Sequence, residues 1–133
     1  MAQARDELLA ALSEPACIVE GETGSGKTTQ VPQFLLEEAC ERATPVNVIV
    51  TQPRRISAIG VADRVAAERG ERAGNGAVGY AVRGESRQCA ETCLLFCTTG
   101  VLLRMLEEDP HLATVTHVLV DEVSKRGLPL TPP

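Results

Sequence analysis

Apolar residues occur along this chain in two alternating patterns, short continuous runs and stretches with helical spacing. The continuous runs have the length of buried strands and cover residues 16–20, 46–51, 94–98 and 116–120, with a weaker candidate at 77–83. Helical spacing occurs within residues 1–12 and at residues 27–40, 55–69 and 100–108. Because alternating strands and helices need crossover connections, the pattern predicts an α/β fold with a parallel sheet between layers of helices. Ligands of such folds bind at the carboxyl ends of the strands.

The helix expected at residues 27–40 contains a proline at an unusual depth. Its apolar side is formed by Val31, Phe34, Leu35 and Ala39. Pro32 has no N–H to donate, and we expect it to kink the first turns of this helix.

The segment Gly21–Thr28 matches the pattern G-x-x-x-x-G-K-[ST] in full, and it lies between an expected strand and an expected helix. Its glycines let backbone amides face a phosphate group, and the following helix adds its positive end. We expect Lys27 to place its ammonium group between the β- and γ-phosphates of ATP, and the Thr28 hydroxyl to bind Mg²⁺. The residues expected to bind the cofactor are Gly21, Glu22, Thr23, Gly24, Ser25, Gly26, Lys27, Thr28 and Thr29. The alternative is a glycine-rich turn without a ligand.

Two carboxylates follow the last apolar run and complete this chemistry. Asp121 and Glu122 come directly after Val120, at the end of an expected strand. Asp121 is the expected second metal ligand, and Glu122, with Lys27, is the expected catalytic residue because it can polarise the attacking water. The alternative is a solvated acidic pair at a strand end.

Length and composition indicate one soluble globular domain. The chain has 133 residues, of which 44% are hydrophobic and 23% charged, and its formal net charge is −5. Because a generally basic surface is absent, nucleic acid would have to be bound through local cationic groups and backbone amides. Arginines cluster near Arg54 and Arg83.

The cysteines and the amino-terminal residues indicate the cellular compartment in which the protein is expected. The cysteines are Cys17, Cys40, Cys89, Cys93 and Cys97. Their odd number, with no export signal before them, argues against a disulfide framework and predicts an intracellular protein of the nucleus or cytoplasm. The last three raise the alternative of a metal site, but zinc usually needs closer pairs and a fourth ligand, so we expect buried free thiols. Residues 1–12 lack the long apolar run of a signal peptide or membrane span.

Four segments in this order resemble one family, the DEAH-box RNA helicases of superfamily 2. GETGSGKTTQVPQF at 21–34 is similar to their motif I, TQPRRISA at 51–58 to motif Ia, CTTGVLLR at 97–104 to motif Ib and VLVDEV at 118–123 to motif II. The wording of residues 97–104 is most similar to the branch containing RNA helicase A. The resemblance implies the P-loop NTPase fold of a RecA-like first motor domain.

The resemblance also implies a surface that grips the sugar-phosphate backbone of single-stranded RNA. The residues on that surface are Thr51, Arg54, Arg55, Thr98, Thr99 and Gly100. Guanidinium groups, hydroxyls and backbone amides suit phosphates and carry no information about base sequence. For Arg54 and Arg55, the alternative is a capping or surface role at the start of the helix at 55–69.

Helicases of this family work by closing two RecA-like domains around the nucleotide, and this chain has room for one. We therefore expect residues 1–123 to form the amino-terminal part of the first domain, truncated after the strand that precedes Asp121. An open sheet edge there predicts association with other chains. The expected activity of the family is ATP-driven RNA unwinding, and the alternative for this chain is a regulatory nucleotide- or RNA-binding fragment without turnover. A third reading, another kind of P-loop ATPase, is disfavoured by the string Thr51–Arg55.

Two positions depart from the family pattern. Gly84 stands where the family usually has phenylalanine, which affects local packing, and Ser124 stands where it has the histidine of Asp-Glu-x-His. That histidine links the nucleotide site to the second domain, so we expect looser coupling between ATP and RNA. Residues 124–133, which include three prolines, are expected to be an extended or disordered tail.

Overall fold

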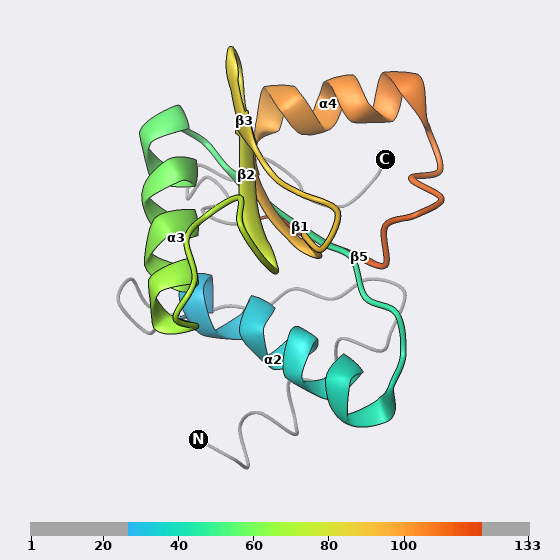
Figure 1. The fold of residues 1–133 in the computed structure, drawn as a ribbon. Coiled ribbons are helices and arrows are strands. Elements are labelled where there is room, and N and C mark those ends of the chain that lie inside the picture. The colour runs from blue at the N-terminus through green and yellow to red at the C-terminus, as the bar shows by residue number, and fades with distance from the viewer. Residues whose placement is uncertain (1–26, 121–133) are drawn as a thin grey trace. The chain divides into compact units, whose positions relative to one another are not determined.

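The computed structural model describes residues 27–120 of the chain, and these fall into two units that divide after Val46. The first unit contributes helix α2, Lys27–Arg42. The described elements of the second unit are β1 (Val48–Gln52), α3 (Arg55–Glu68), β2 (Val78–Val82), β3 (Glu85–Arg87), β4 (Leu94–Thr98), α4 (Thr99–Glu108) and β5 (His117–Val120), shown in Figure 1. The sequence-based predictions for residues 1–26 and 121–133 lie outside the described residues.

Helix α2 confirms the helix expected at 27–40 and runs two residues further. Pro32 lies inside it and is fully buried, and the helix continues through it. The side-chain amide of Gln33 donates to the carbonyl of Thr29 at 2.8 Å, which adds a bond in the turn where proline removes a donor. The helix ends at Arg42, and the next residue, Ala43, has a left-handed φ of 53°. The Thr44 N–H donates to the carbonyl of Ala39 at 2.9 Å, which closes the end of the helix.

The second unit is built on a five-stranded sheet with the order β3-β2-β4-β1-β5. Strands β2, β4, β1 and β5 are parallel, as the sequence predicts. Strand β3 was not predicted, and it makes the sheet mixed because it pairs with β2 in antiparallel fashion. Its residues, Glu-Ser-Arg, have no apolar alternation from which a strand could be recognised.

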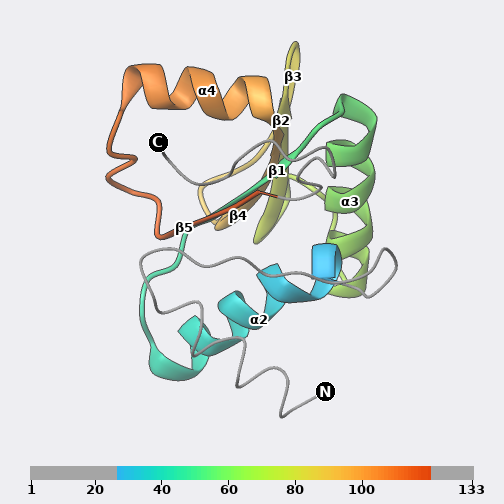
Figure 2. The same ribbon diagram turned by 180° about the vertical axis from the view of Figure 1, so that it is seen from behind.

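Helices cover both faces of this sheet, which gives the expected three layers (Figures 1 and 2). On one face, α3 buries Ala58, Ala62, Val65 and Ala66. On the other, Leu102 of α4 joins a core cluster with residues of β1, β2 and β4, namely Ile49, Ala81, Leu95 and Cys97. Strands β1 and β2 are buried throughout, as central strands covered on both faces should be.

Strand β5 is the edge strand beside β1 within residues 47–120. Its residues alternate between half-buried and exposed, and the exposed ones are Val118 and Val120. Whether this edge causes association stays a prediction. None of the helices in the described part of the chain is both long enough and apolar enough to cross a membrane.

Candidate functional site

The phosphate-binding segment is described only at its carboxyl end. Gly21 to Gly26 lie outside the described residues, and Lys27, the first described residue, is helical within α2. The phosphate-binding pattern requires a helix at this lysine. Thr29, the last of the expected cofactor-binding residues, is buried in the first turns of α2.

The expected acidic pair follows the last described strand. Val120 ends β5 and is in register with Thr51 of β1, so the chain leaves β5 at the carboxyl edge of the parallel sheet. Asp121 and Glu122 come next in the sequence and lie outside the described residues. Their expected roles in binding Mg²⁺ and polarising water remain predictions.

The residues expected to contact RNA are brought together by the pairing of β1 with β4. These strands are parallel neighbours, with Thr51 opposite Cys97 and Gln52 opposite Thr98. Each strand leads into a helix at its carboxyl end, β1 into α3 and β4 into α4. All six expected RNA-contact residues therefore lie at one edge of the sheet, although the two groups are more than forty residues apart in the sequence.

Two helix N-termini open onto this edge without side-chain caps. Arg54 and Thr98 are the N-cap residues of α3 and α4, both are extended, and neither side chain makes a capping hydrogen bond. Neither helix has an acidic residue in its first turn. Arg54 therefore occupies the N-cap position of α3, as the capping alternative expects, but its side chain does not cap the helix. Both helices present N–H groups and the positive end of the helix dipole at this edge.

Burial separates the residues at this edge into two groups. Arg54, Arg55, Thr99 and Gly100 are exposed, and Thr98 is half-buried. The Thr51 side chain is different, because only 2% of its surface is exposed. It lies within the sheet, where it supports the edge and is not open to a ligand.

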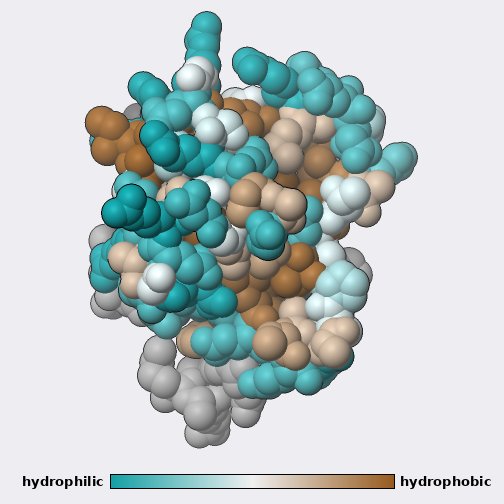
Figure 3. Space-filling model, in the orientation of Figure 1, coloured by the Kyte–Doolittle hydropathy of each residue, from teal (hydrophilic) through white to brown (hydrophobic). Residues whose placement is uncertain are grey.

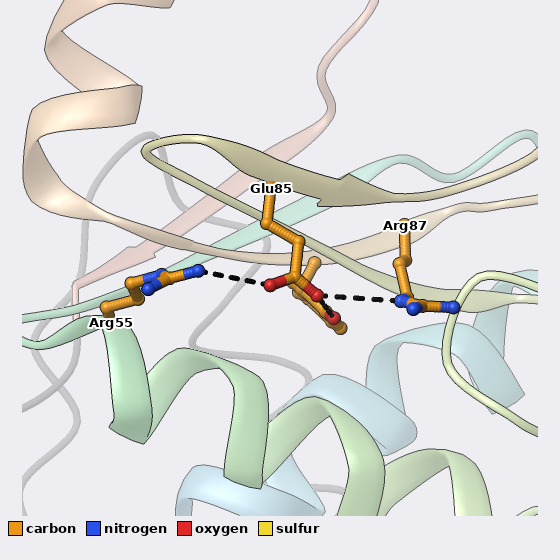
Figure 4. Close-up of polar contacts among 4 residues, drawn as sticks. Arg55, Glu85 and Arg87 are labelled. Carbon is orange, nitrogen blue, oxygen red and sulfur yellow. Dashed lines mark hydrogen bonds and ion pairs between the residues drawn. The ribbon is translucent and has the colours of Figure 1, made fainter.

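An ion-pair network that sequence reasoning missed holds one of these arginines (Figure 4). Nη2 of Arg55 donates to Oε1 of Glu85 at 3.1 Å, the hydroxyl of Tyr80 donates to Oε2 of the same carboxylate, and Nε of Arg87 lies 3.5 Å from Oε2. The hydrogen bond from Tyr80 lowers the pKa of Glu85, and the same bond raises the pKa of Tyr80. Only recognition of the β2–β3 hairpin would have paired these residues, and its one sequence signal is Gly84, which adopts a φ of 83° at the turn.

The described cysteines are free thiols, but not all are buried as expected. Cys97 is buried, Cys89 and Cys93 are half-buried, and Cys40 is exposed on α2. Burial raises the pKa of the Cys97 thiol to about 11. Within residues 27–120, no group of three His, Cys, Asp or Glu side chains is arranged to hold a metal ion. Cys17 lies outside the described residues.

The surface at the start of α3 is mixed in character. In Figure 3, hydrophilic side chains cover the tip of the β2–β3 hairpin, at the top, and a hydrophobic patch lies at the upper left. Ile56, which follows Arg55 in α3, is 83% exposed, so the exposed arginines at this edge stand next to an exposed apolar side chain.

Comparisons with known proteins show the family of the chain. Residues 2–126 match the model of the DEAD/DEAH box helicase family. The chain is 56% identical over 127 residues to the DExH-box ATP-dependent RNA helicase DExH1 of Arabidopsis thaliana, covering 93% of this chain and 13% of that protein. It is 53% identical over 118 residues to the ATP-dependent RNA helicase DHX29 of Homo sapiens, covering 84% of this chain and 9% of that protein. The chain therefore spans about a tenth of the length of these relatives.

Proposed function

Because the chain belongs to the DEAD/DEAH box helicase family, we propose that it is part of the ATP-driven motor of an RNA helicase. In this proposal, one site binds ATP with Mg²⁺ and a second grips the backbone of single-stranded RNA. The parallel pairing of β1 with β4 carries the proposal, since it gathers two distant sets of phosphate-binding groups at one sheet edge.

The nucleotide site is assigned to residues 21–29 together with the acidic pair. Lys27 binds the β- and γ-phosphates with its ammonium group, and backbone amides of the glycine-rich segment bind the remaining oxygens. Thr28 and Asp121 would hold Mg²⁺, which when bound neutralises charge on the phosphates. Glu122 takes the role of orienting and polarising the attacking water. The helical conformation of the chain from Lys27 onward supports this assignment.

The RNA site is assigned to the exposed groups at the carboxyl edge of β1 and β4. Arg54 and Arg55 supply guanidinium groups, and Thr98 and Thr99 supply hydroxyls. The uncapped N-termini of α3 and α4 add backbone N–H donors. All of these contacts are local, so they are compatible with a net charge of −5.

Unwinding by the whole protein is proposed to require a second RecA-like domain. The relatives are about ten times longer than this chain, so they have room for such a domain. Closure of two domains around ATP would then transmit hydrolysis to the RNA held at the sheet edge.

A second function, binding without turnover, is favoured by one observation. Ser124 stands at the position where the resemblance leads us to expect histidine. A serine there would weaken the link between the nucleotide and the rest of the motor. In that case the chain would act as a regulatory binder of nucleotide or RNA.

Phosphate release by the purified chain, with and without RNA, distinguishes the two functions. If the chain hydrolyses ATP, RNA should stimulate release, and Lys27→Ala should remove the activity because the phosphates lose their ammonium partner. A retained binding signal with background release in both proteins would support the non-hydrolysing binder. Release that persists in Lys27→Ala would contradict the assigned nucleotide site.

A further inference from the structure

Glu85 is a carboxylate that three elements hold at once. It receives Arg55 from α3, Tyr80 from β2 and Arg87 from β3 (Figure 4). Two of its partners, Tyr80 and Arg87, belong to the same hairpin, and the third stands at the edge assigned to RNA. The network therefore connects the hairpin to the start of α3.

The hairpin fixes where Glu85 can lie. Val82 is opposite Glu85 and Tyr80 is opposite Arg87, so these four side chains share the face of the sheet that α3 covers. Tyr80 is only 3% exposed, so its ring is enclosed by the surrounding structure, and its hydroxyl donates to the carboxylate. Glu85 is thus held by its own hairpin independently of Arg55.

Arg55, unlike Glu85, is not held in place by its own element. It is the first residue of α3, its side chain is 55% exposed, and a cation at a helix N-terminus is repelled by the helix dipole. An unrestrained arginine there would sample many rotamers. The bond to Glu85 engages Nη2, whereas a guanidinium carries five N–H donors. Arg55 is therefore restrained at one side and still has donors for a second anion.

We propose that Glu85 is a positioning residue for RNA binding, which holds the Arg55 guanidinium in place for a phosphate of the RNA backbone. Tyr80 and Arg87 hold Glu85 in turn. This inference rests on the proposed function and deepens it, because it assigns a role to a carboxylate that does not itself touch RNA. Restraining the arginine before binding reduces the entropy lost when the phosphate arrives.

Charge alone predicts the opposite effect, which makes the inference testable. Glu85→Gln removes a negative charge near an RNA surface, and the general electrostatic term should then tighten binding. A positioning role instead predicts weaker binding, because Arg55 loses its charged anchor. The Tyr80 hydroxyl can still donate to the glutamine, so the hairpin keeps its fold.

The test is the affinity of the full 133-residue chain for a short fluorescein-labelled oligouridylate, measured by fluorescence anisotropy at low salt. We expect Glu85→Gln to weaken binding by about 2- to 10-fold, the effect of immobilising one long side chain on binding. In an Arg55→Ala background, Glu85→Gln should no longer weaken binding, because there is no arginine left to position. The matched control is Glu68→Gln, which breaks a comparable exposed ion pair with Arg64 at the other end of α3 and should not weaken binding.

The outcomes separate this inference from the function on which it rests. Unchanged or tighter binding by Glu85→Gln would overturn the positioning role while leaving the RNA site intact. An equal loss in the Arg55→Ala background would mean that Glu85 acts through the fold, which also overturns it. If Arg55→Ala alone leaves the affinity unchanged, the contact between Arg55 and RNA is wrong, and the inference falls with it.

Discussion

At the scale of single residues, burial decides which groups can meet a ligand or a reagent. Thr51 and Cys97 face each other across β1 and β4, and both are enclosed in the sheet. Arg54, three positions after Thr51, is exposed. The sequence marked Thr51 and Arg54 as equivalent RNA contacts, because the resemblance assigns positions and says nothing about exposure. Only packing distinguishes them.

The cysteines provide a prediction at this scale. At pH 8 in the native protein, iodoacetamide should modify Cys40 and leave Cys97 unmodified, because Cys97 is buried and its pKa is raised to about 11. Since the folded pKa lies above the ordinary value of 9.0, Cys97 also makes stability fall as pH rises from 9 towards 11. Peptide mass mapping with and without denaturant checks the modification. Equal labelling of both cysteines in the native protein would show that β4 is not buried.

At the scale of elements, the β2–β3 hairpin is the part that sequence patterns could not reveal. Within residues 27–120, the helices and the parallel strands follow from apolar periodicity, and their observed bounds differ from the expected ones by a few residues. Strand β3 is polar and short, and it exists because Gly84 turns the chain and β2 offers an edge. Strand β3 also brings Glu85 to Arg55. Because the sequence did not predict this strand, it could not predict the ion pair either.

Alanine substitutions at two glycines, Gly79 in β2 and Gly60 in α3, test how closely this hairpin is packed. A β-carbon at Gly79 would lie 2.5 Å from the carbonyl oxygen of Arg87, so Gly79→Ala should destabilise the fold by about 1–3 kcal/mol. Gly60, on α3, has no atom within 4 Å of such a carbon, and Gly60→Ala should instead stabilise by about 0.5–1 kcal/mol. Urea unfolding monitored by circular dichroism measures both. A destabilisation of the same size in the two variants would contradict the close approach of β3 to β2.

At the scale of the whole molecule, the sequence predicted the fold class and the family, and the structure adds the meeting of distant segments. The strings at 51–58 and 97–104 identify the family by their wording, and neither string indicates that the other is its neighbour. The strand order supplies that information. Strand β4 lies between β2 and β1 in the sheet, so it pairs with β1 although β2 and β3 separate the two strands in the sequence. The central claim is that this shared edge binds the RNA backbone.

The most direct test of that claim is the salt dependence of affinity for single-stranded RNA, compared between Arg54→Ala and Arg64→Ala. Both variants remove one exposed arginine from α3 or its N-cap, but only Arg54 lies at the shared edge. If Arg54 binds a phosphate, its loss should lower the slope of log affinity against log salt by about 0.7, equally for oligouridylate and for mixed sequences. Arg64→Ala should leave the slope unchanged. Equal slopes for the two variants would contradict an RNA site at the carboxyl edge of β1 and β4.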